Sequence, residues 1–365
     1  MRYLKIAIIG LGNIGLSHAK HILSGEIAGL QLVAVCARSA EKAENFPNIT
    51  FYSDFHKLLD DHVADAVLIT TPHYDHPAIA IEAFQKGYHV LCEKPSGVYT
   101  KAVRQMNEAA EKSGRVFSLM LNQRTDPLYR NVRDLIAEGA IGTPHRLIWI
   151  LTDWYRTQAY YDCCHWRGTW AGEGGGVLMN QGIHQLDLWQ WFMGMPQSIT
   201  AHCPTGKYHN IEVEDEATVF AKYENGATAT FIITTGEYPG TNRLEIAGSQ
   251  GKIVVENNIL RLTRLEKPTT ETIFESAYVN TQAAATLPAA TEEFRFENRN
   301  AGHVAILQNF TNAVLKDEPL IAPGAEGIHN LTLCNAAYLS HWTNSEVSLP
   351  LDEDLYYNLL QQHIS

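Results

Sequence analysis

The chain has 365 residues, which is long enough for two domains with complete hydrophobic cores. Hydrophobic residues make up 45% and charged residues 19% of it, the proportions of an ordinary soluble globular protein. The formal net charge of −12 argues against nucleic acid or an anionic membrane as a partner. No apolar run reaches transmembrane length, and the N-terminal residues lead directly into a predicted strand without a signal peptide. We therefore expect a cytoplasmic protein with no membrane partner.

The six cysteines form no Cys-x-x-Cys pair and show no zinc-ligand spacing. Cys163 and Cys164 precede His165, but adjacent side chains of an extended segment point to opposite faces and make a poor chelate. We therefore expect reduced structural thiols and no metal site.

The first predicted element is a buried strand over residues 4–9, followed by a glycine turn and a helix over 16–24. Between strand and helix, Gly10 would allow a tight turn, Gly12 a close approach of a pyrophosphate, and Gly15 close packing of the helix. An ordinary strand-to-helix turn is the alternative. The candidate dinucleotide contacts in this turn are Gly10, Gly12, Asn13, Ile14 and Gly15.

Buried strands and helices continue to alternate up to about residue 120. The further predicted strands cover 30–36, 65–70, 88–92 and 116–120, and the helices cover 53–59, 76–86 and 101–113. This alternation predicts a doubly wound, parallel α/β sheet of the Rossmann type over residues 1–122, covered by helices on both faces. Ligands bind at the carboxyl edge of such a sheet.

The end of the second strand bears on the choice of cofactor. A carboxylate there would bind the ribose 2′-hydroxyl of NAD, but the chain has Ala37, Arg38 and Ser39 instead. Arg38 and Ser39 could bind a 2′-phosphate, so we expect NADP somewhat more than NAD, with use of both open. The alternative is that Arg38 only stacks on adenine, which fits either dinucleotide.

The pattern changes after residue 122 and predicts a second, α+β domain over 123–365 with a largely antiparallel, open sheet. A strong hairpin signal, Asn225-Gly226, lies between two of its strands. The predicted strands cover 145–154, 218–223, 227–234, 243–247, 252–256 and 259–265; the helices 126–139, 177–193, 303–315 and 325–342; and the long loops 155–170 and 267–290. The final helices could pack back on the first domain. Because an open sheet needs a cover, we expect a homodimer or homotetramer.

Glu93-Lys94-Pro95 follows the strand 88–92, at the carboxyl edge of the first sheet. A lysine at this edge can donate a hydrogen bond to a substrate oxygen and stabilise a developing alkoxide. The alternative for Lys94 is the usual one for lysine, a solvated position on a surface loop.

A second polar group lies in the predicted helix 177–193, after three consecutive glycines. Asn180 and His184 are four residues apart, which places them one turn apart on one face, and Asp187 lies on the same side. His184 is a candidate general base. The alternative is a core histidine whose ring is held by Asp187.

Together, the glycine turn at 10–15, the Glu-Lys-Pro tripeptide at 93–95 and the run from Gly174 to Asp187 resemble the Gfo/Idh/MocA oxidoreductases. This family includes glucose-fructose oxidoreductase and inositol dehydrogenases. The three motifs occur in the family's order, and the resemblance extends from the first strand to the final helices. The segment 166–170 is most similar to the sugar and polyol dehydrogenase branch.

The resemblance implies that Lys94 contacts the reacting hydroxyl and that His184 is the acid/base. The family's acidic residue four positions before the histidine is replaced here by Asn180, whose amide can orient substrate or Lys94 but cannot hold the proton. The cofactor contacts that the resemblance implies are Thr71, Pro72, His73, His76, Glu93, Lys94 and Asn122.

We therefore expect an NAD(P)-dependent oxidoreductase that transfers hydride between the nicotinamide and a hydroxyl or carbonyl carbon of a sugar or cyclic polyol. Tyr161 and Trp166 could stack on the sugar ring, with Asp153 and Arg156 bonding its hydroxyls, together with Lys94, Asn180 and His184; packing of a domain interface is the alternative for the aromatics. Two other functions stay open: a glycosidase that works by transient oxidation and elimination, and a non-catalytic regulator that senses the cofactor.

Overall fold

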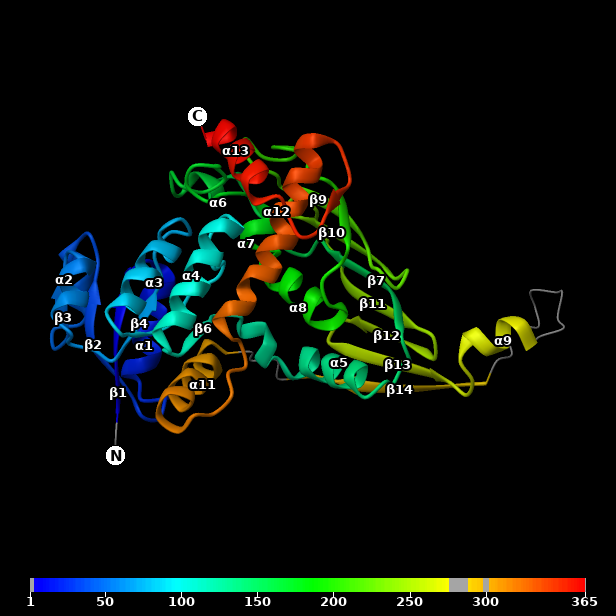
Figure 1. Ribbon diagram of the computed structural model, residues 1–365, viewed down its shortest axis with the longest axis horizontal. Helices are drawn as coiled ribbons and strands as arrows, with labels where there is room; N and C mark the ends of the chain where they lie inside the picture. The colour runs from blue at the N-terminus through cyan, green and yellow to red at the C-terminus, as the bar shows by residue number, and fades with distance from the viewer. Residues whose placement is uncertain (1–2, 276–287, 298–301, 365) are drawn as a thin grey trace.

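The computed structural model describes residues 3–275, 288–297 and 302–364, which form two β-sheets with helices packed around them (Figure 1). The first sheet has six parallel strands in the order β3-β2-β1-β4-β5-β6. Its strands are β1 (Leu4–Ile9), β2 (Leu30–Cys36), β3 (Thr50–Tyr52), β4 (Ala66–Ile69), β5 (His89–Cys92) and β6 (Phe117–Leu119). The predicted doubly wound sheet is confirmed.

The central strands β1 and β4 are buried on both faces, as a parallel sheet covered by helices requires. The helices of this half are α1 (Asn13–Leu23), α2 (Phe55–Asp60), α3 (Asp75–Gln85) and α4 (Thr100–Ser113), with the 3₁₀ helix η1 (Ala40–Asn45). Helix α2 starts two residues later than predicted because the Asp54 carboxylate accepts a hydrogen bond from the backbone N–H of His56 and caps it. Strand β3 was not predicted, since its three residues are too short to show a pattern.

The second sheet has nine strands among the described residues, in the order β14-β13-β12-β11-β7-β10-β9-β8-β15. All neighbouring pairs are antiparallel except β7 and β10, so the predicted largely antiparallel sheet is confirmed. Its strands are β7 (Pro144–Leu151), β8 (Ser198–His202), β9 (Glu216–Lys222), β10 (Thr228–Thr234), β11 (Asn242–Gly248), β12 (Gly251–Glu256), β13 (Ile259–Leu265), β14 (Ala289–Arg295) and β15 (Val347–Ser348). The Asn225-Gly226 turn joins β9 to β10, as predicted.

Two predicted loops contain regular structure, which is a correction. The aromatic loop 155–170 includes helix α6 (Gln158–Asp162). The loop predicted over 267–290 includes helix α9 (Thr269–Glu275) and the start of β14, while its residues 276–287 lie outside the described residues. Strand β14 is exposed and is joined to β13 by polar pairs such as Arg261 with Glu293, so it lacks the apolar alternation that predicts a strand.

The predicted helix 177–193 is interrupted, which is a second correction. It forms α7 (Val177–Asn180) and α8 (Ile183–Met193), and between them the N–H of Gly182 donates to the carbonyl of Val177, five residues back. The other helices of this half are η2 (Asn122–Thr125), α5 (Pro127–Ala137), α11 (His303–Lys316), η3 (Gly324–Glu326), α12 (Gly327–Thr343) and α13 (Glu353–Ile364). Helix α13 was not predicted.

The last helices lie against both halves of the molecule. Helix α11 packs on β1, and α12 packs on both α4 and α8, as the orange ribbons of Figure 1 show. The Gln308 amide on α11 makes hydrogen bonds of 2.8 and 3.1 Å with the backbone of Ala28, and Arg104 on α4 forms an ion pair with Glu353 on α13. Residues 1–122 and 123–365 remain our predicted division into domains.

Arg124 joins the end of the first sheet to the second half. This side chain is 1% exposed and forms two hydrogen bonds of 2.7 Å with the Asp187 carboxylate on α8. It also contacts Glu326, just before α12. A bidentate ion pair of this kind fixes both the distance and the relative orientation of the two groups, so Arg124 sets the position of α8 relative to the first sheet.

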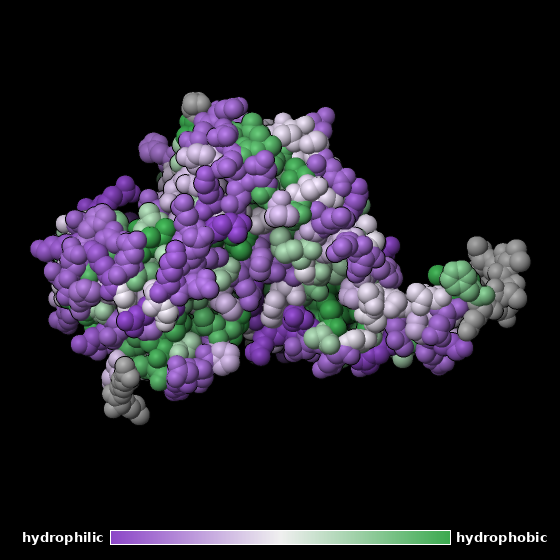
Figure 2. All heavy atoms as spheres, in the orientation of Figure 1, coloured by the Kyte–Doolittle hydropathy of each residue, from purple (hydrophilic) through white to green (hydrophobic). Residues whose placement is uncertain are grey.

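Hydrophilic residues dominate the face of the molecule shown in Figure 2, with hydrophobic residues in smaller groups between them. Within the described residues, no helix combines the length and apolar character needed to span a membrane.

Replacing Arg124 with Met should lower the free energy of unfolding by about 3 kcal/mol, because Asp187 would remain buried without its counter-charge. Urea denaturation measures this loss. Arg130→Ala, at an exposed position on α5, is the matched control and should change stability by no more than about 0.5 kcal/mol. Similar losses for the two variants would contradict the role given to Arg124.

Candidate active site

The glycine turn leaves open space at the start of α1. A Cβ on Gly15 would lie 2.2 Å from the Gly10 carbonyl oxygen, so only glycine lets helix and turn approach so closely. A Cβ on Gly12 would meet no atom within 4 Å. Gly12 also precedes the first turn of an eleven-residue helix, where unpaired N–H groups favour an anion. The residues present therefore fit the pyrophosphate of a dinucleotide, and Asn13 and Ile14 lie in the same turn.

The loop after β4 is tied to the turn after β5 by His76. This ring is buried, with Nδ1 2.8 Å from the Pro95 carbonyl oxygen and Nε2 2.8 Å from the Thr71 carbonyl oxygen. Through these two contacts His76 holds the Lys94-Pro95 turn in place, and its predicted cofactor contact stays a prediction. Pro72 is exposed beside it.

Glu93 also serves the turn. Its carboxylate is buried, lies 2.7 Å from Nε2 of His18 on α1, and accepts the backbone N–H of Lys94 at 3.1 Å. Burial opposes its ionisation, but the His18 contact and the Lys94 charge overcome this and hold the pKa of Glu93 at about 2. Glu93 is therefore an anionic support for Lys94, and its predicted cofactor contact stays a prediction.

Lys94 reaches from the first sheet to α7. Its ammonium Nζ donates to the Asn180 backbone carbonyl at 2.9 Å and lies 3.3 Å from Asn180 Oδ1. Burial lowers the pKa of Lys94, while Glu93 and Glu173 oppose that shift and Arg167 adds to it. Lys94 is therefore held inside the molecule, which removes the alternative of a solvated surface lysine.

The position of Asn180 is fixed by the glycine run before it. A Cβ on Gly176 would lie 1.9 Å from the backbone carbonyl oxygen of Glu214, so α7 can begin here only with glycine. The buried Glu214 carboxylate then accepts the N–H groups of Gly176 and Leu178, both at 2.9 Å, and caps the helix. Burial raises the pKa of Glu214 to about 7.

His184 lies in the first turn of α8, half-buried, and no described residue gives its Nδ1 a hydrogen-bond partner. Burial, with a smaller contribution from the Lys94 charge, lowers the pKa of His184 to about 3. The imidazole is therefore neutral near pH 7 and close enough to Lys94 to interact with its charge. Asp187 is bound to Arg124, so the alternative of a His184 ring held by Asp187 is wrong.

One residue of the site was missed by our sequence reasoning. Glu173 is 2% exposed, and its carboxylate contacts the Asn180 amide and accepts the Gly168 N–H at 2.8 Å. Its backbone carbonyl lies 2.9 Å from Nδ1 of His73, whose pKa burial lowers to about 3. A charged residue between glycines, Gly172-Glu173-Gly174, was the available signal.

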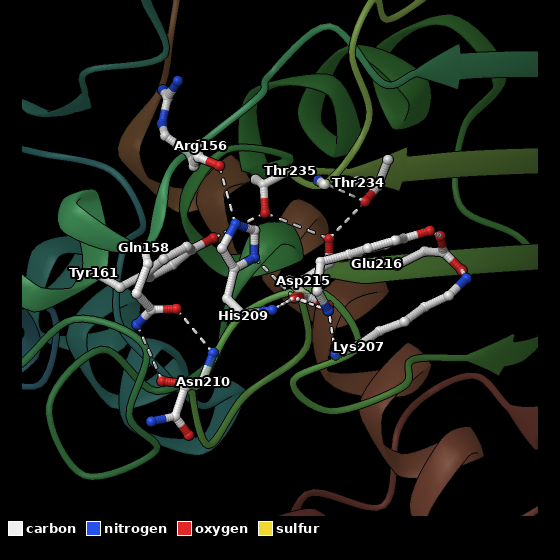
Figure 3. A network of polar contacts seen from close by, with 12 residues as sticks. Arg156, Gln158, Tyr161, Lys207, His209, Asn210, Asp215, Glu216, Thr234 and Thr235 are labelled. Carbon is white, nitrogen blue, oxygen red and sulfur yellow. Dashed lines mark hydrogen bonds and ion pairs between the residues drawn. The ribbon is translucent and has the colours of Figure 1, made fainter.

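A polar network holds the aromatic loop, and it includes Tyr161 and the backbone of Arg156, two of the predicted sugar contacts (Figure 3). His209 lies between the Asp215 carboxylate, at 2.9 Å, and the Arg156 carbonyl oxygen, at 3.0 Å. The buried Tyr161 packs on the His209 ring and bonds Thr235 through its hydroxyl, so it cannot stack on a sugar as predicted. The backbone of Arg156 belongs to this network, while its guanidinium points away from it and lies over the Tyr160 ring.

The remaining predicted residues occupy different surroundings. The Trp166 ring is half-buried near His73, with ring centroids 6.0 Å apart, and His73 in turn contacts the backbone carbonyl of Glu173. Asp153 is exposed after β7. Arg38 and Ser39 are exposed directly after β2, and Asn122 opens η2.

The two adjacent cysteines require a correction. They follow the short helix α6 rather than lying in an extended segment, and their sulfur atoms are 3.4 Å apart. The described part of the chain contains no cluster of three or more potential metal ligands, and its six cysteines are free.

Comparison with known proteins gives matches to both halves. Residues 4–121 match a family model described as an oxidoreductase family with an NAD-binding Rossmann fold, and residues 129–254 match the GFO/IDH/MocA C-terminal domain. Myo-inositol 2-dehydrogenase of Thermotoga maritima is 25% identical over 92% of this chain and 95% of that protein. D-glucoside 3-dehydrogenase of Escherichia coli is 25% identical over 95% and 97%. The WlbA dehydrogenase of Bordetella pertussis, solved with NADH and UDP-GlcNAcA, superimposes with a TM-score of 0.79 at 27% identity over 96% of this chain and all of that one.

Gly12→Ala should weaken NADH binding about tenfold or more, because the added methyl occupies the space that a pyrophosphate needs. The melting temperature should stay close to that of the parent, since no atom lies within 4 Å of the new Cβ. NADH fluorescence titration and thermal unfolding measure the two quantities.

Gly15→Ala is the contrasting variant, and it should lower the melting temperature because its Cβ collides with the Gly10 carbonyl. Unchanged NADH affinity in Gly12→Ala would show that the dinucleotide does not approach this turn.

Proposed function

Since the chain belongs to the Gfo/Idh/MocA oxidoreductase family, we propose that it transfers hydride between a nicotinamide dinucleotide and a hydroxyl-bearing carbon of a sugar or cyclic polyol. The relatives named above are dehydrogenases of an inositol and of a glucoside, which supports this class of substrate. No observation favours the glycosidase or the non-catalytic regulator, and we propose neither.

The observation that carries the proposal is that the Lys94 ammonium reaches Asn180, four residues before His184, and that its charge acts on the His184 imidazole. Lys94 comes from the carboxyl edge of the first sheet and His184 from α8, and the Lys94 charge contributes to the low pKa of His184. A fixed cation beside a neutral imidazole provides an electrostatic donor and a proton acceptor for the same hydroxyl.

In the oxidative direction, His184 accepts the proton of the reacting hydroxyl, and Lys94 donates a hydrogen bond to the oxygen as negative charge develops on it. Asn180 fixes the position of the Lys94 ammonium by accepting its hydrogen bonds. The nicotinamide dinucleotide, when bound, supplies the hydride acceptor. The chain's own contribution is therefore orientation, charge and a proton acceptor. Asp153, Arg156 and Trp166 remain our candidates for contacts with the sugar.

The choice between the two dinucleotides follows from the end of β2. The exposed Arg38 and Ser39 stand where a carboxylate would bind the 2′-hydroxyl of NAD, so we propose that this end of the site also accepts the 2′-phosphate of NADP.

We also propose that a second copy covers the open sheet. On the face of the central strands away from the core, Ile148 and Ile150 of β7 are half-buried, and Ile150 pairs with the half-buried Ile232 of β10. Phe220 of β9 is exposed on the same face. These apolar side chains support the homodimer or homotetramer expected above, which stays a prediction.

Lys94→Met and His184→Ala should each lower kcat/KM at least a hundredfold, because each removes a group that acts on the reacting hydroxyl. Both variants should still bind NADH, because the glycine turn that fits the pyrophosphate is unchanged. The measurement follows nicotinamide absorbance with myo-inositol, scyllo-inositol, D-glucose and methyl glucoside, and then repeats the most active pair with both variants.

Lys101→Met and His145→Ala are the matched controls, since both residues are exposed and lie outside the site. Near-parental turnover in Lys94→Met or His184→Ala would remove that residue from the mechanism. Sugar release without any absorbance change would contradict net oxidation.

Arg38→Ala should weaken NADPH binding about tenfold and change NADH binding little, because only the 2′-phosphate needs the guanidinium. Fluorescence titration with both reduced dinucleotides measures the ratio. Equal losses for the two dinucleotides would assign Arg38 to adenine stacking and end the 2′-phosphate proposal.

A further inference from the structure

Glu173 is a buried carboxylate whose position is fixed on every side. Its Oε2 accepts the Gly168 N–H at 2.8 Å, its own N–H donates to the Thr169 carbonyl at 3.0 Å, and its carbonyl contacts Nδ1 of His73. The residue is 2% exposed. The carboxylate therefore cannot turn toward solvent without breaking this turn.

The remaining oxygen, Oε1, accepts a hydrogen bond from Nδ2 of Asn180. An ionised carboxylate only accepts hydrogen bonds and an ammonium only donates them. The Asn180 amide between them must therefore direct its NH₂ group to Glu173 and its Oδ1 to Lys94, which is the arrangement observed. Glu173 thus determines which face of the amide meets the lysine.

The charges around Lys94 show why this orientation matters. Burial disfavours its ammonium, and Glu93 and Glu173 are the carboxylates that oppose this loss. Glu93 lies on the side of the first sheet and is held by His18. Burial raises the pKa of Glu173, while the Gly168 N–H, the Asn180 amide and the Arg167 and Lys94 charges favour its ionised form. In that form Glu173 supplies negative charge from the side of α7. The other ionisable groups coupled to Lys94 are Arg167, His73, His184 and His303.

We propose that Glu173 is a positioning residue for the oxidoreductase site: its carboxylate orients Asn180 and, through that amide, keeps Lys94 directed and charged. This inference rests on the proposed function only in assuming that Lys94 acts on the reacting hydroxyl. It also explains why position 180 can be an amide. The negative charge sits on Glu173, on the far side of Asn180, so Lys94 needs no carboxylate in direct contact.

Loss of the Glu173 charge should lower the pKa of Lys94, since a neighbouring anion stabilises the ammonium. A lysine with a lower pKa becomes neutral at a lower pH. The alkaline limb of kcat/KM, where the ammonium is lost, should then move to lower pH. A residue with a purely structural role would lower activity without moving this limb.

Glu173→Gln tests the proposal while keeping the shape of the side chain. Glutamine offers one acceptor and one donor where Gly168 N–H and Asn180 Nδ2 both require an acceptor, so one of the two contacts is lost. The direct readout is competitive labelling with acetic anhydride across a pH series, with mass spectrometry of the Lys94 peptide. Only the neutral amine reacts, so the labelling midpoint reports the Lys94 pKa and requires no substrate.

The labelling midpoint in Glu173→Gln should lie about one pH unit below that of the parent. The double variant E173Q/N180D moves the carboxylate to position 180, directly against Lys94, and should restore the midpoint. This rescue distinguishes lost charge from lost folding, which thermal unfolding checks separately. Glu212→Gln is the matched control, because its side chain is exposed although its backbone N–H bonds the same Gly168.

An unchanged midpoint in folded Glu173→Gln, or a lowered one that E173Q/N180D leaves low, would overturn the proposal. A lowered and rescued midpoint supports it even if myo-inositol, scyllo-inositol, D-glucose and methyl glucoside all fail as substrates. That last result would count against the proposed function and leave the role of Glu173 standing.

Discussion

The structure depends on how one half-buried ammonium is accommodated. Lys94 follows the carboxyl edge of the first sheet. Burial there destabilises its charged form unless hydrogen-bond acceptors and anions surround the ammonium. Asn180 provides the acceptors from the second half, and Glu93 and Glu173 provide negative charge from either side. The two halves therefore share one charged group, and their relative position is part of the site.

The relative position of the two halves is set by residues other than Lys94 and His184. Arg124 binds Asp187 on the helix that carries His184, and His76 ties the Lys94-Pro95 turn to the neighbouring loop. These buried polar residues determine where Lys94 and His184 lie. This explains why His76 supports backbone on two sides and why Asp187 does not hold His184.

The sequence was sufficient for the features that repeat along the chain. Alternating buried strands predicted the parallel sheet, and Asn225-Gly226 predicted a hairpin. It was insufficient where tertiary contacts decide the local structure. The break between α7 and α8 lies inside a segment with continuous helical spacing, and strand β14 is held by polar pairs without apolar alternation. Glu173 was missed because its partners, Gly168 and Asn180, lie five and seven residues away along an irregular path.

The most direct test of the account is a crystal structure of the protein with NADH and the sugar or polyol that gives the highest turnover. We predict that one substrate oxygen, on the carbon facing the nicotinamide, lies within about 3.2 Å of both Lys94 Nζ and a ring nitrogen of His184. A substrate whose reacting oxygen is out of reach of either group would contradict the account.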